Sequence, residues 1–233
     1  MEAVTKGIFY GVGIGPGDPE LLTLKAVRTL EACPVIAAPQ TKSGGMLALD
    51  IAQQAVDLSR KELLPLYFSM SRDPAVLAAA REEAAQAVRE RLDTGLDVAM
   101  LNLGDVSIYA TCSYLMDILD RQGYRTVMIP GVPSFCAVAA RLGVSLTEMN
   151  SPLHIAPGSS DLDATLDLPG TKVLMKSGRQ LPAVLKALKE RDLLDHSMLV
   201  ENCGLPTEVV CSDLSREQPE ADAGYFVTLI VKE

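Results

Sequence analysis

The sequence predicts an α/β fold, with a mainly parallel sheet in its first part and a smaller, mixed α+β domain in its second. In residues 8–129, short apolar runs typical of buried strands alternate with longer runs typical of helices. After them, five strand-like runs are interrupted by only two clear helical patterns. Strands separated by helices pair in parallel, whereas strands that follow one another closely favour antiparallel pairing. We therefore expect two domains, 1–134 and 135–233.

The elements of the first domain follow from apolar runs and their punctuation. Asp18-Pro19 and Asp73-Pro74 each place a carboxylate at a helix N-cap and a proline at the first helical position. Glycines end the later helices. The predicted strands are 8–14, 35–38, 63–68, 97–101 and 124–129. The predicted helices are 18–30, 46–56, 73–92 and 109–121.

The second domain is predicted in the same way. Its strands are 154–156, 172–175, 198–201, 208–211 and 226–231, and its helices are 161–166 and 181–191. The turns between the later strands contain Gly204, Pro206, Pro219 and Gly224.

Composition excludes several classes of protein. The formal charge of −9 argues against nucleic-acid binding, which requires a basic face. No apolar run reaches the roughly 18–20 residues that span a bilayer, and the first residues lack the layout of a signal peptide, so we expect a cytoplasmic protein. The five cysteines form no Cys-x-x-Cys pair and the two histidines have no ligand spacing, so no protein-bound metal is expected.

Residues 7–24 hold five glycines between a strand and a helix start. This stretch is shaped like a phosphate loop but fails the tests for one. A nucleotide P-loop ends in Gly-Lys-Ser/Thr, whereas here the glycines are followed by Asp18, which repels phosphate. The dinucleotide fingerprint requires a third glycine where this chain has Pro16. The loop therefore suits close backbone approach to a ligand that is not a phosphate.

Three loops rich in Gly, Pro and Asp follow predicted parallel strands: 13–19, 102–107 and 130–134. Ligands of such sheets bind at the carboxyl ends of the strands, so we expect the loops to converge there. Asp105 has a second reading as the cap of the following helix. No nucleophile with a paired base is visible, and Ser134 is better placed to cap a helix. The pattern favours a reaction in which the protein positions a reactant that is already activated.

These loops resemble those of the tetrapyrrole methylases, which transfer methyl groups from S-adenosylmethionine to corrinoid and sirohaem precursors. The resemblance rests on Gly13-Ile14-Gly15-Pro16-Gly17-Asp18-Pro19 and Gly104-Asp105-Val106-Ser107-Ile108-Tyr109. It continues in order through Pro130–Ser134, Met175, Glu201-Asn202-Cys203-Gly204 and the last strand. Within the family, the stretches Tyr10–Lys25 and Asp105–Tyr114 look most like the enzymes that methylate C-20 of precorrin-2 or cobalt-factor II.

The resemblance implies a homodimer of two α/β domains with S-adenosylmethionine in the cleft between them. The matched cofactor positions are Pro16, Leu103, Gly104, Asp105, Ile108, Tyr109, Pro133, Ser134, Met175 and Gly204. Asp105 is expected to orient the amino-acid part of the cofactor, and Asp105 and Tyr109 are the positioning candidates. The substrate's carboxylate arms call for cations, and the candidates in loops or after strands are Lys42, Arg72, Lys176 and Arg179.

The sequence leaves three matters open. The substrate could be cobalt-factor II in the cobalamin pathway or metal-free precorrin-2, with a weak preference for the cobalt form. The alternatives within the enzyme class are methylation of another tetrapyrrole carbon and diphthine synthesis. An alternative of another class is a regulatory module that binds S-adenosylmethionine without turnover.

Overall fold

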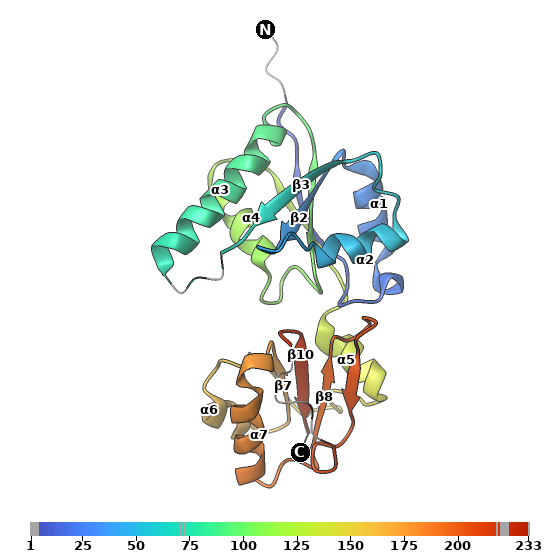
Figure 1. Ribbon diagram of the computed structural model, residues 1–233, viewed down its shortest axis with the longest axis vertical. Coiled ribbons are helices and arrows are strands. Elements are labelled where there is room, and N and C mark those ends of the chain that lie inside the picture. The colour runs from blue at the N-terminus through green and yellow to red at the C-terminus, as the bar shows by residue number, and fades with distance from the viewer. Residues whose placement is uncertain (1–4, 70, 72, 218, 220–223, 233) are drawn as a thin grey trace. The chain divides into compact units, whose positions relative to one another are not determined.

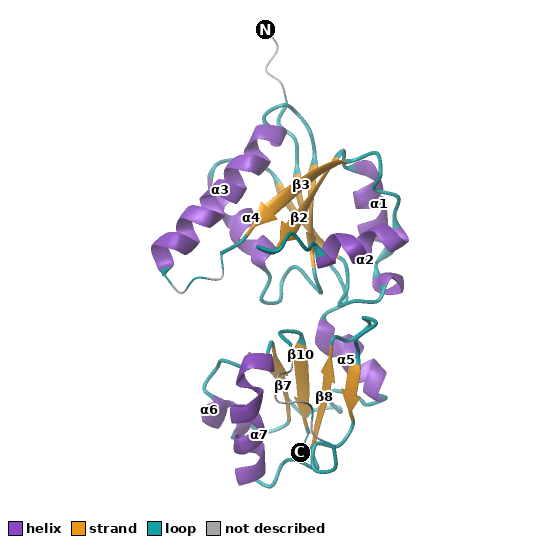
Figure 2. Cartoon of the chain, viewed as in Figure 1, coloured by secondary structure: helices purple, strands orange, loops and turns teal. Residues whose placement is uncertain are grey.

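The computed structural model describes residues 5–69, 71, 73–217, 219 and 224–232. The chain divides into two compact units, Met1–Pro133 and Ser134–Glu233. Each unit has its own five-stranded sheet with helices packed against it (Figure 1). Figure 2 shows that the loops of each unit gather at the ends of its strands.

The sheet of the first unit is parallel throughout, as the alternation of strands and helices predicts. Its strand order is β3-β2-β4-β1-β5. The strands are β1 (Phe9–Gly13), β2 (Val35–Gln40), β3 (Glu62–Tyr67), β4 (Val98–Asn102) and β5 (Thr126–Ile129). The three strands β4, β1 and β5, which lead into the three predicted site loops, are therefore neighbours.

Helices cover both faces of this sheet. In Figure 1, α1 (Leu24–Ala32) and α2 (Leu47–Ala55) lie on one side of it, and α3 (Pro74–Leu92) and α4 (Thr111–Arg121) lie on the other. Gly11 allows α4 to approach β1 closely, because a Cβ at Gly11 would lie 2.7 Å from the Cys112 sulfur. The core on the α3/α4 side includes Phe9, Met100 and Leu115, each fully buried.

One continuous helix over 18–30 was predicted, and this is wrong. Asp18 does accept a hydrogen bond from Glu20 N (2.8 Å), but the helix it starts is a single 3-10 turn, η1 (Pro19–Leu21). Leu22 and Thr23 then have extended backbone angles, and the Thr23 hydroxyl accepts from Ala26 N (3.1 Å) to start α1. Two N-caps five residues apart thus divide the segment into two helices.

The second unit has a mixed sheet of order β6-β7-β10-β8-β9. Its strands are β6 (Leu153–Pro157), β7 (Thr171–Met175), β8 (Ser197–Glu201), β9 (Val209–Cys211) and β10 (Val227–Val231). β6 and β7 are parallel, and the other neighbours are antiparallel, which confirms the pairing predicted for the later strands. Because β7 and β8 both run opposite to β10, they run in the same direction and end at the same edge.

Helices α6 (Leu162–Leu166) and α7 (Leu181–Glu190) lie on one side of this sheet, with a core that includes Leu174, Leu199 and Leu229. A further helix, α5 (Ser134–Leu142), lies on the other side (Figure 1). A helix at this point agrees with the expectation that Ser134 caps one, although its bounds were not predicted. The α5 segment is short and mostly apolar, so its pattern alone does not distinguish a buried helix from a buried strand.

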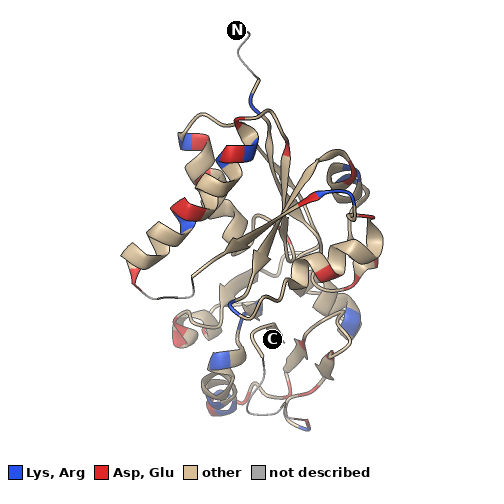
Figure 3. Ribbon diagram, turned by 45° about the horizontal axis from the view of Figure 1, so that its top comes forward, with Lys and Arg blue, Asp and Glu red and all other residues tan. Residues whose placement is uncertain are grey.

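Charged residues occur mainly in helices and loops, with acidic and basic residues interspersed (Figure 3). In the strands of the first sheet, the one charged residue is Glu62. Over the described part of the chain, no helix combines the length and the apolar character needed to cross a membrane.

Candidate active site

The three glycine loops of the first unit converge at the carboxyl ends of its strands, as predicted. Gly15 and Gly104 form an antiparallel bridge in which Gly104 N donates to Gly15 O (2.7 Å). Ile14 N donates to Asn102 O (3.0 Å), and the Thr23 hydroxyl donates to Pro130 O (3.4 Å). Loops 13–19, 102–107 and 130–134 thus form one connected surface.

Glycine is required where these loops touch. A Cβ at Gly13 would lie 2.6 Å from Gly131 N and 2.8 Å from Gly104 O. A Cβ at Gly131 would lie 2.7 Å from the Gly13 carbonyl carbon. These are backbone atoms in neighbouring loops, so they cannot rotate away as a side chain would. The glycines therefore permit contact between the loops themselves.

Asp105 ties two of these loops together. Its Oδ2 accepts from Gly131 N (2.8 Å), and its Oδ1 accepts from Ser107 N (2.8 Å) and from the Ser107 hydroxyl. Burial acts to raise the pKa of Asp105, but the hydrogen bonds from Ser107, Gly131 and Val106 outweigh it and the pKa is lowered. The alternative role as a helix cap is wrong, because the N-cap of α4 is Ala110 and no side chain caps it.

Four backbone donors of these loops are already used within the protein. Ile14 N, Gly15 N, Gly104 N and Gly131 N all donate to carbonyl or carboxylate oxygens of the unit itself. Phosphate binding by a glycine loop depends on backbone N–H groups that point at the ligand. These four donors therefore do not serve a phosphate.

The other predicted positions in the first unit lie in the same loops. Pro16 and Gly104 are buried, and Leu103 and Ile108 are half-buried. Asn102 holds the second loop through Nδ2, which donates to Leu103 O (3.0 Å) and Asp105 O (3.2 Å). Tyr109 is 44% exposed and has a φ of 47°, a left-handed conformation that bulky residues rarely adopt. Strained backbone of this kind gathers at functional sites.

In the second unit, the predicted positions lie where β7 and β8 end. Met175 is the buried last residue of β7, and Glu201 is the last residue of β8. Each strand is followed by a left-handed residue that is not glycine: Lys176, with a φ of 55°, and Asn202, with a φ of 52°. The two strands therefore leave the sheet by the same sharp turn of the backbone.

Glu208 holds the turn after β8. Its Oε2 accepts from Gly204 N (2.9 Å), and its Oε1 accepts from Arg141 Nε on α5. Burial acts to raise the pKa of Glu208, but the Gly204 N–H, Arg141 and Cys203 lower it. A carboxylate thus fixes a glycine N–H in each unit, Asp105 in the first and Glu208 in the second.

Ser134 is the first residue of α5, and its hydroxyl lies 3.4 Å from that of Thr228. Thr228 pairs with Met175 across β10 and β7, so the second unit brings Ser134, Thr228 and Met175 together. Pro133 is the last residue of the first unit. Sequence reasoning overlooked both Thr228 and Glu208. Thr228 has a signal, a hydroxyl in the apolar run Val227–Val231, whereas Glu208 has none.

The basic substrate candidates are only partly brought together. Lys176 follows β7, and Arg179 is exposed in the short helix η2 (Gly178–Gln180) that comes next. Lys42 is exposed in the turn after β2, in the other unit. Arg72 lies outside the described residues.

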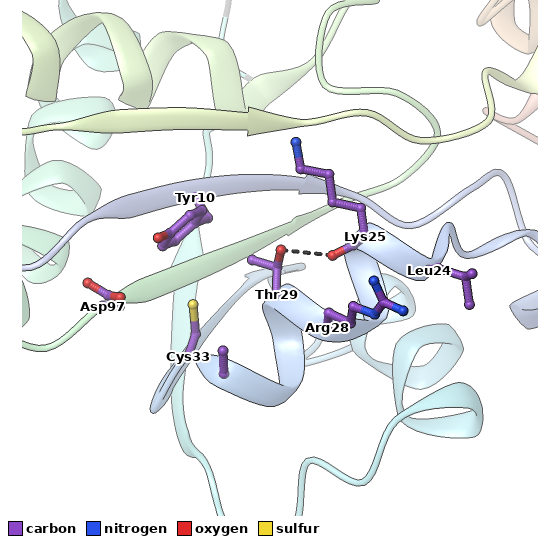
Figure 4. A pocket seen from close by; sticks show the side chains of 8 residues that line it. Tyr10, Leu24, Lys25, Arg28, Thr29, Cys33 and Asp97 are labelled. Atoms are coloured by element: carbon purple, nitrogen blue, oxygen red, sulfur yellow. Dashed lines mark hydrogen bonds between the residues drawn. The ribbon is translucent and has the colours of Figure 1, made fainter.

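A separate pocket of about 490 Å³ in the first unit contains none of the predicted positions. Tyr10, Cys33 and Asp97 line it near the amino ends of strands, and Lys25 and Thr29 line it along α1 (Figure 4). Burial, with a smaller effect of Asp97, raises the pKa of Cys33 to about 12, so this thiol is not a nucleophile at neutral pH. Ligands of parallel sheets bind at the opposite edge.

Solved structures share this fold. A cobalt precorrin-4 methyltransferase matches with a TM-score of 0.75 at 19% identity, over 97% of this chain and 94% of the other. The uroporphyrin-III C-methyltransferase of Thermus thermophilus, complexed with S-adenosylhomocysteine, matches with a TM-score of 0.69 at 23% identity, over 97% and 98%. The fold is therefore one that methyltransferases of tetrapyrroles adopt.

Sequence comparison identifies the family. The chain belongs to the Tetrapyrrole (Corrin/Porphyrin) Methylases, whose family model matches residues 9–217. The "Probable cobalt-precorrin-2 C(20)-methyltransferase" of Methanocaldococcus jannaschii is 35% identical, over 82% of this chain and 81% of the relative. The cobalt-precorrin-2 C(20)-methyltransferase of Salmonella typhimurium is 28% identical, over 97% of both. The precorrin-2 C(20)-methyltransferase of a Sinorhizobium species is 30% identical, over 99% and 97%.

Proposed function

We propose that this protein transfers a methyl group from S-adenosylmethionine to C-20 of cobalt-factor II or precorrin-2. The relatives that match over most of their length carry C-20 activity in their names. The observation that carries the proposal is the joined set of glycine loops whose backbone donors are already used. Such loops suit a cation rather than a phosphate, and the sulfonium of S-adenosylmethionine is a cation.

The residues present fit this cofactor. Gly13 and Gly131 allow the loops to meet backbone to backbone, and no positively charged side chain occurs in residues 13–19, 102–107 or 130–134. We propose that Pro16, Leu103, Gly104, Ile108 and Tyr109 hold the cofactor, together with Pro133, Ser134, Met175 and Gly204. When bound, the sulfonium supplies a methyl group that already carries its leaving group.

The task of the protein is then to position the two reactants. In this proposal the loops would orient the bound cofactor toward the substrate, and the buried residues behind them would exclude water. A preorganised surface would then make the main contribution to the rate.

We propose that Asp105 acts on the cofactor through the loops it joins. It was expected to orient the amino-acid part of the cofactor, but both of its carboxylate oxygens accept hydrogen bonds from the protein. A carboxylate engaged in this way contributes more to loop geometry than to direct binding.

The decisive experiment offers precorrin-2 and cobalt-factor II in parallel with S-adenosylmethionine carrying a labelled methyl group. The proposal expects one labelled methyl per product by mass spectrometry, placed at C-20 by NMR, with equimolar S-adenosylhomocysteine. Methylation at another carbon, or cofactor binding with no product from either substrate, would contradict it.

The remaining parts of the proposal are a homodimer and a cytoplasmic location. The homodimer rests on the resemblance to the family. Light scattering of the purified protein tests it, with a mass near twice 24.9 kDa expected.

A further inference from the structure

The edge of the second sheet presents two neighbouring aromatic side chains to solvent. Tyr225 and Phe226 are 42% and 39% exposed. Their ring centroids are 5.3 Å apart and their planes meet at 81°, the edge-to-face arrangement that aromatic pairs prefer. Single exposed apolar residues are common, but an exposed aromatic pair held in a fixed geometry requires an explanation.

The backbone under this pair is fixed on both sides. Ser177 N donates to Val227 O (3.2 Å) on the β7 side, and Asn202 N donates to Phe226 O (3.0 Å) on the β8 side. Glu201 also accepts a hydrogen bond from Gly224 N, just before the pair. The aromatic rings are therefore carried by an ordered extension of β10.

A cation accompanies the pair. The Lys176 ammonium lies 5.6 Å from the centroid of the Tyr225 ring, and the backbone of Lys176 is in the left-handed conformation that brings the chain out of β7. Arg179 follows, exposed, in η2. Lys176, which lies over Tyr225, directly follows Met175, and Asn202, which donates to Phe226 O, lies two residues before Gly204. The residues that contact the pair are therefore close in sequence to two of the predicted cofactor positions.

We infer that Tyr225, Phe226 and Lys176 form a platform for the conjugated ring of the tetrapyrrole, which stacks on the face of Tyr225 and meets the edge of Phe226, with Lys176 and Arg179 beside its carboxylates. This inference rests on the proposed function. Two flat rings take part in that reaction, the tetrapyrrole and the adenine of the cofactor. The charges decide between them, because the tetrapyrrole is a polyanion whereas S-adenosylmethionine carries a sulfonium that Lys176 and Arg179 would repel.

The test compares Tyr225→Leu, Tyr225→Phe and Lys176→Gln with Leu168→Ala, a truncation of a residue of the same unit that is 39% exposed. For each variant, the KM for cobalt-factor II and the Kd for S-adenosylhomocysteine are measured. We expect Tyr225→Leu to raise the KM about tenfold, with Tyr225→Phe close to wild type because it keeps the ring. Lys176→Gln is expected to raise the KM and to weaken its dependence on salt. Leu168→Ala is expected to change neither constant.

An unchanged KM in Tyr225→Leu would overturn the inference. If the affinity for S-adenosylhomocysteine also became weaker, the platform would be assigned to adenine. Absorbance titration of cobalt-factor II into the protein saturated with S-adenosylhomocysteine measures ring binding without turnover. If wild type binds the ring through Tyr225 but forms no product, the proposed function fails and the platform stands. If Tyr225→Leu binds the ring as wild type does, the platform fails.

Discussion

Replacing Asp105 with Asn tests how the glycine loops are held together. The carboxylate accepts hydrogen bonds from Gly131 N and Ser107 N, both at 2.8 Å, and one from the Ser107 hydroxyl. An amide keeps one acceptor and places an NH2 group against a backbone donor. The bond to Gly131 is the one that joins the loops, and losing a hydrogen bond to a charged group costs about 1.5–3 kcal/mol.

We expect Asp105→Asn to lower the free energy of unfolding of the first unit by about 2 kcal/mol at pH 7. For a chain of this size, that corresponds to a fall of about 4–8 °C in Tm. Since the pKa of Asp105 is lowered in the folded state, its stabilisation is complete above the unfolded pKa of about 3.9 and is lost as pH falls through the folded value. The difference between variant and wild type should therefore shrink in acid.

Calorimetry with two ligands distinguishes loop geometry from direct contact. S-adenosylhomocysteine has the amino-acid part of the cofactor, whereas 5′-methylthioadenosine lacks it. If Asp105 acts through the loops, Asp105→Asn weakens both ligands by the same factor, and the Gly131 amide exchanges its hydrogen faster. Ser107→Ala, which leaves the bond to Gly131 intact, is the matched control. Weaker binding of S-adenosylhomocysteine alone, with Gly131 still protected, would refute this reasoning and restore the direct contact.

Three further predictions concern other parts of the site and the core. Gly131→Ala places a Cβ against the backbone of two other loops, so we expect the free energy of unfolding to fall by at least about 3 kcal/mol and cofactor binding to be lost. In the control Gly45→Ala, the Cβ would meet only the Thr41 hydroxyl, at 3.4 Å, and the free energy of unfolding should stay within about 1 kcal/mol of wild type. Urea denaturation measures both. Glu208→Gln removes the negative charge that accepts hydrogen bonds from Gly204 N and Arg141, and we expect the affinity for S-adenosylhomocysteine to fall about tenfold. The control Leu168→Ala should bind as wild type does. Equal affinities in Glu208→Gln and wild type would contradict the role given to Glu208. In the native protein at pH 8, a maleimide should label the exposed Cys136 and leave the buried Cys33 and Cys112 unlabelled, because burial raises the pKa of both thiols to about 12. Peptide mapping identifies the labelled residues. A labelled Cys33 would contradict the burial described for it.

The fold was largely predictable because local signals agree with the global arrangement. Asp73-Pro74 and Asp161 begin helices where expected, and the Asp side chains accept the capping hydrogen bonds. The convergence of the three loops was predictable too, since parallel strands end at one edge. The single turn at Pro19–Leu21 was not predicted, because Asp18 and Thr23 are both acceptable caps and both are used, which divides the segment.

The contacts that hold the site were beyond the sequence for a different reason. Asp105 reaches Gly131 across 26 residues, and Arg141 reaches Glu208 across 67. Nothing in the residue types marks those partners, because each bond depends on which strands are neighbours. Gly204 and Glu208 are only four residues apart, yet their bond forms in a loop, where that spacing has no regular geometry.

Because backbone N–H groups of the loops are hydrogen-bonded within the protein, the loops also affect which adenosine compounds can bind. ATP and S-adenosylmethionine share an adenosine, so a site that recognised adenosine alone would be open to ATP. If the cofactor binds at these loops as proposed, the bridge between Gly15 and Gly104 and the bond from Gly131 to Asp105 occupy N–H groups that a triphosphate would need. The same contacts that give the loops their shape would then disfavour the nucleotide.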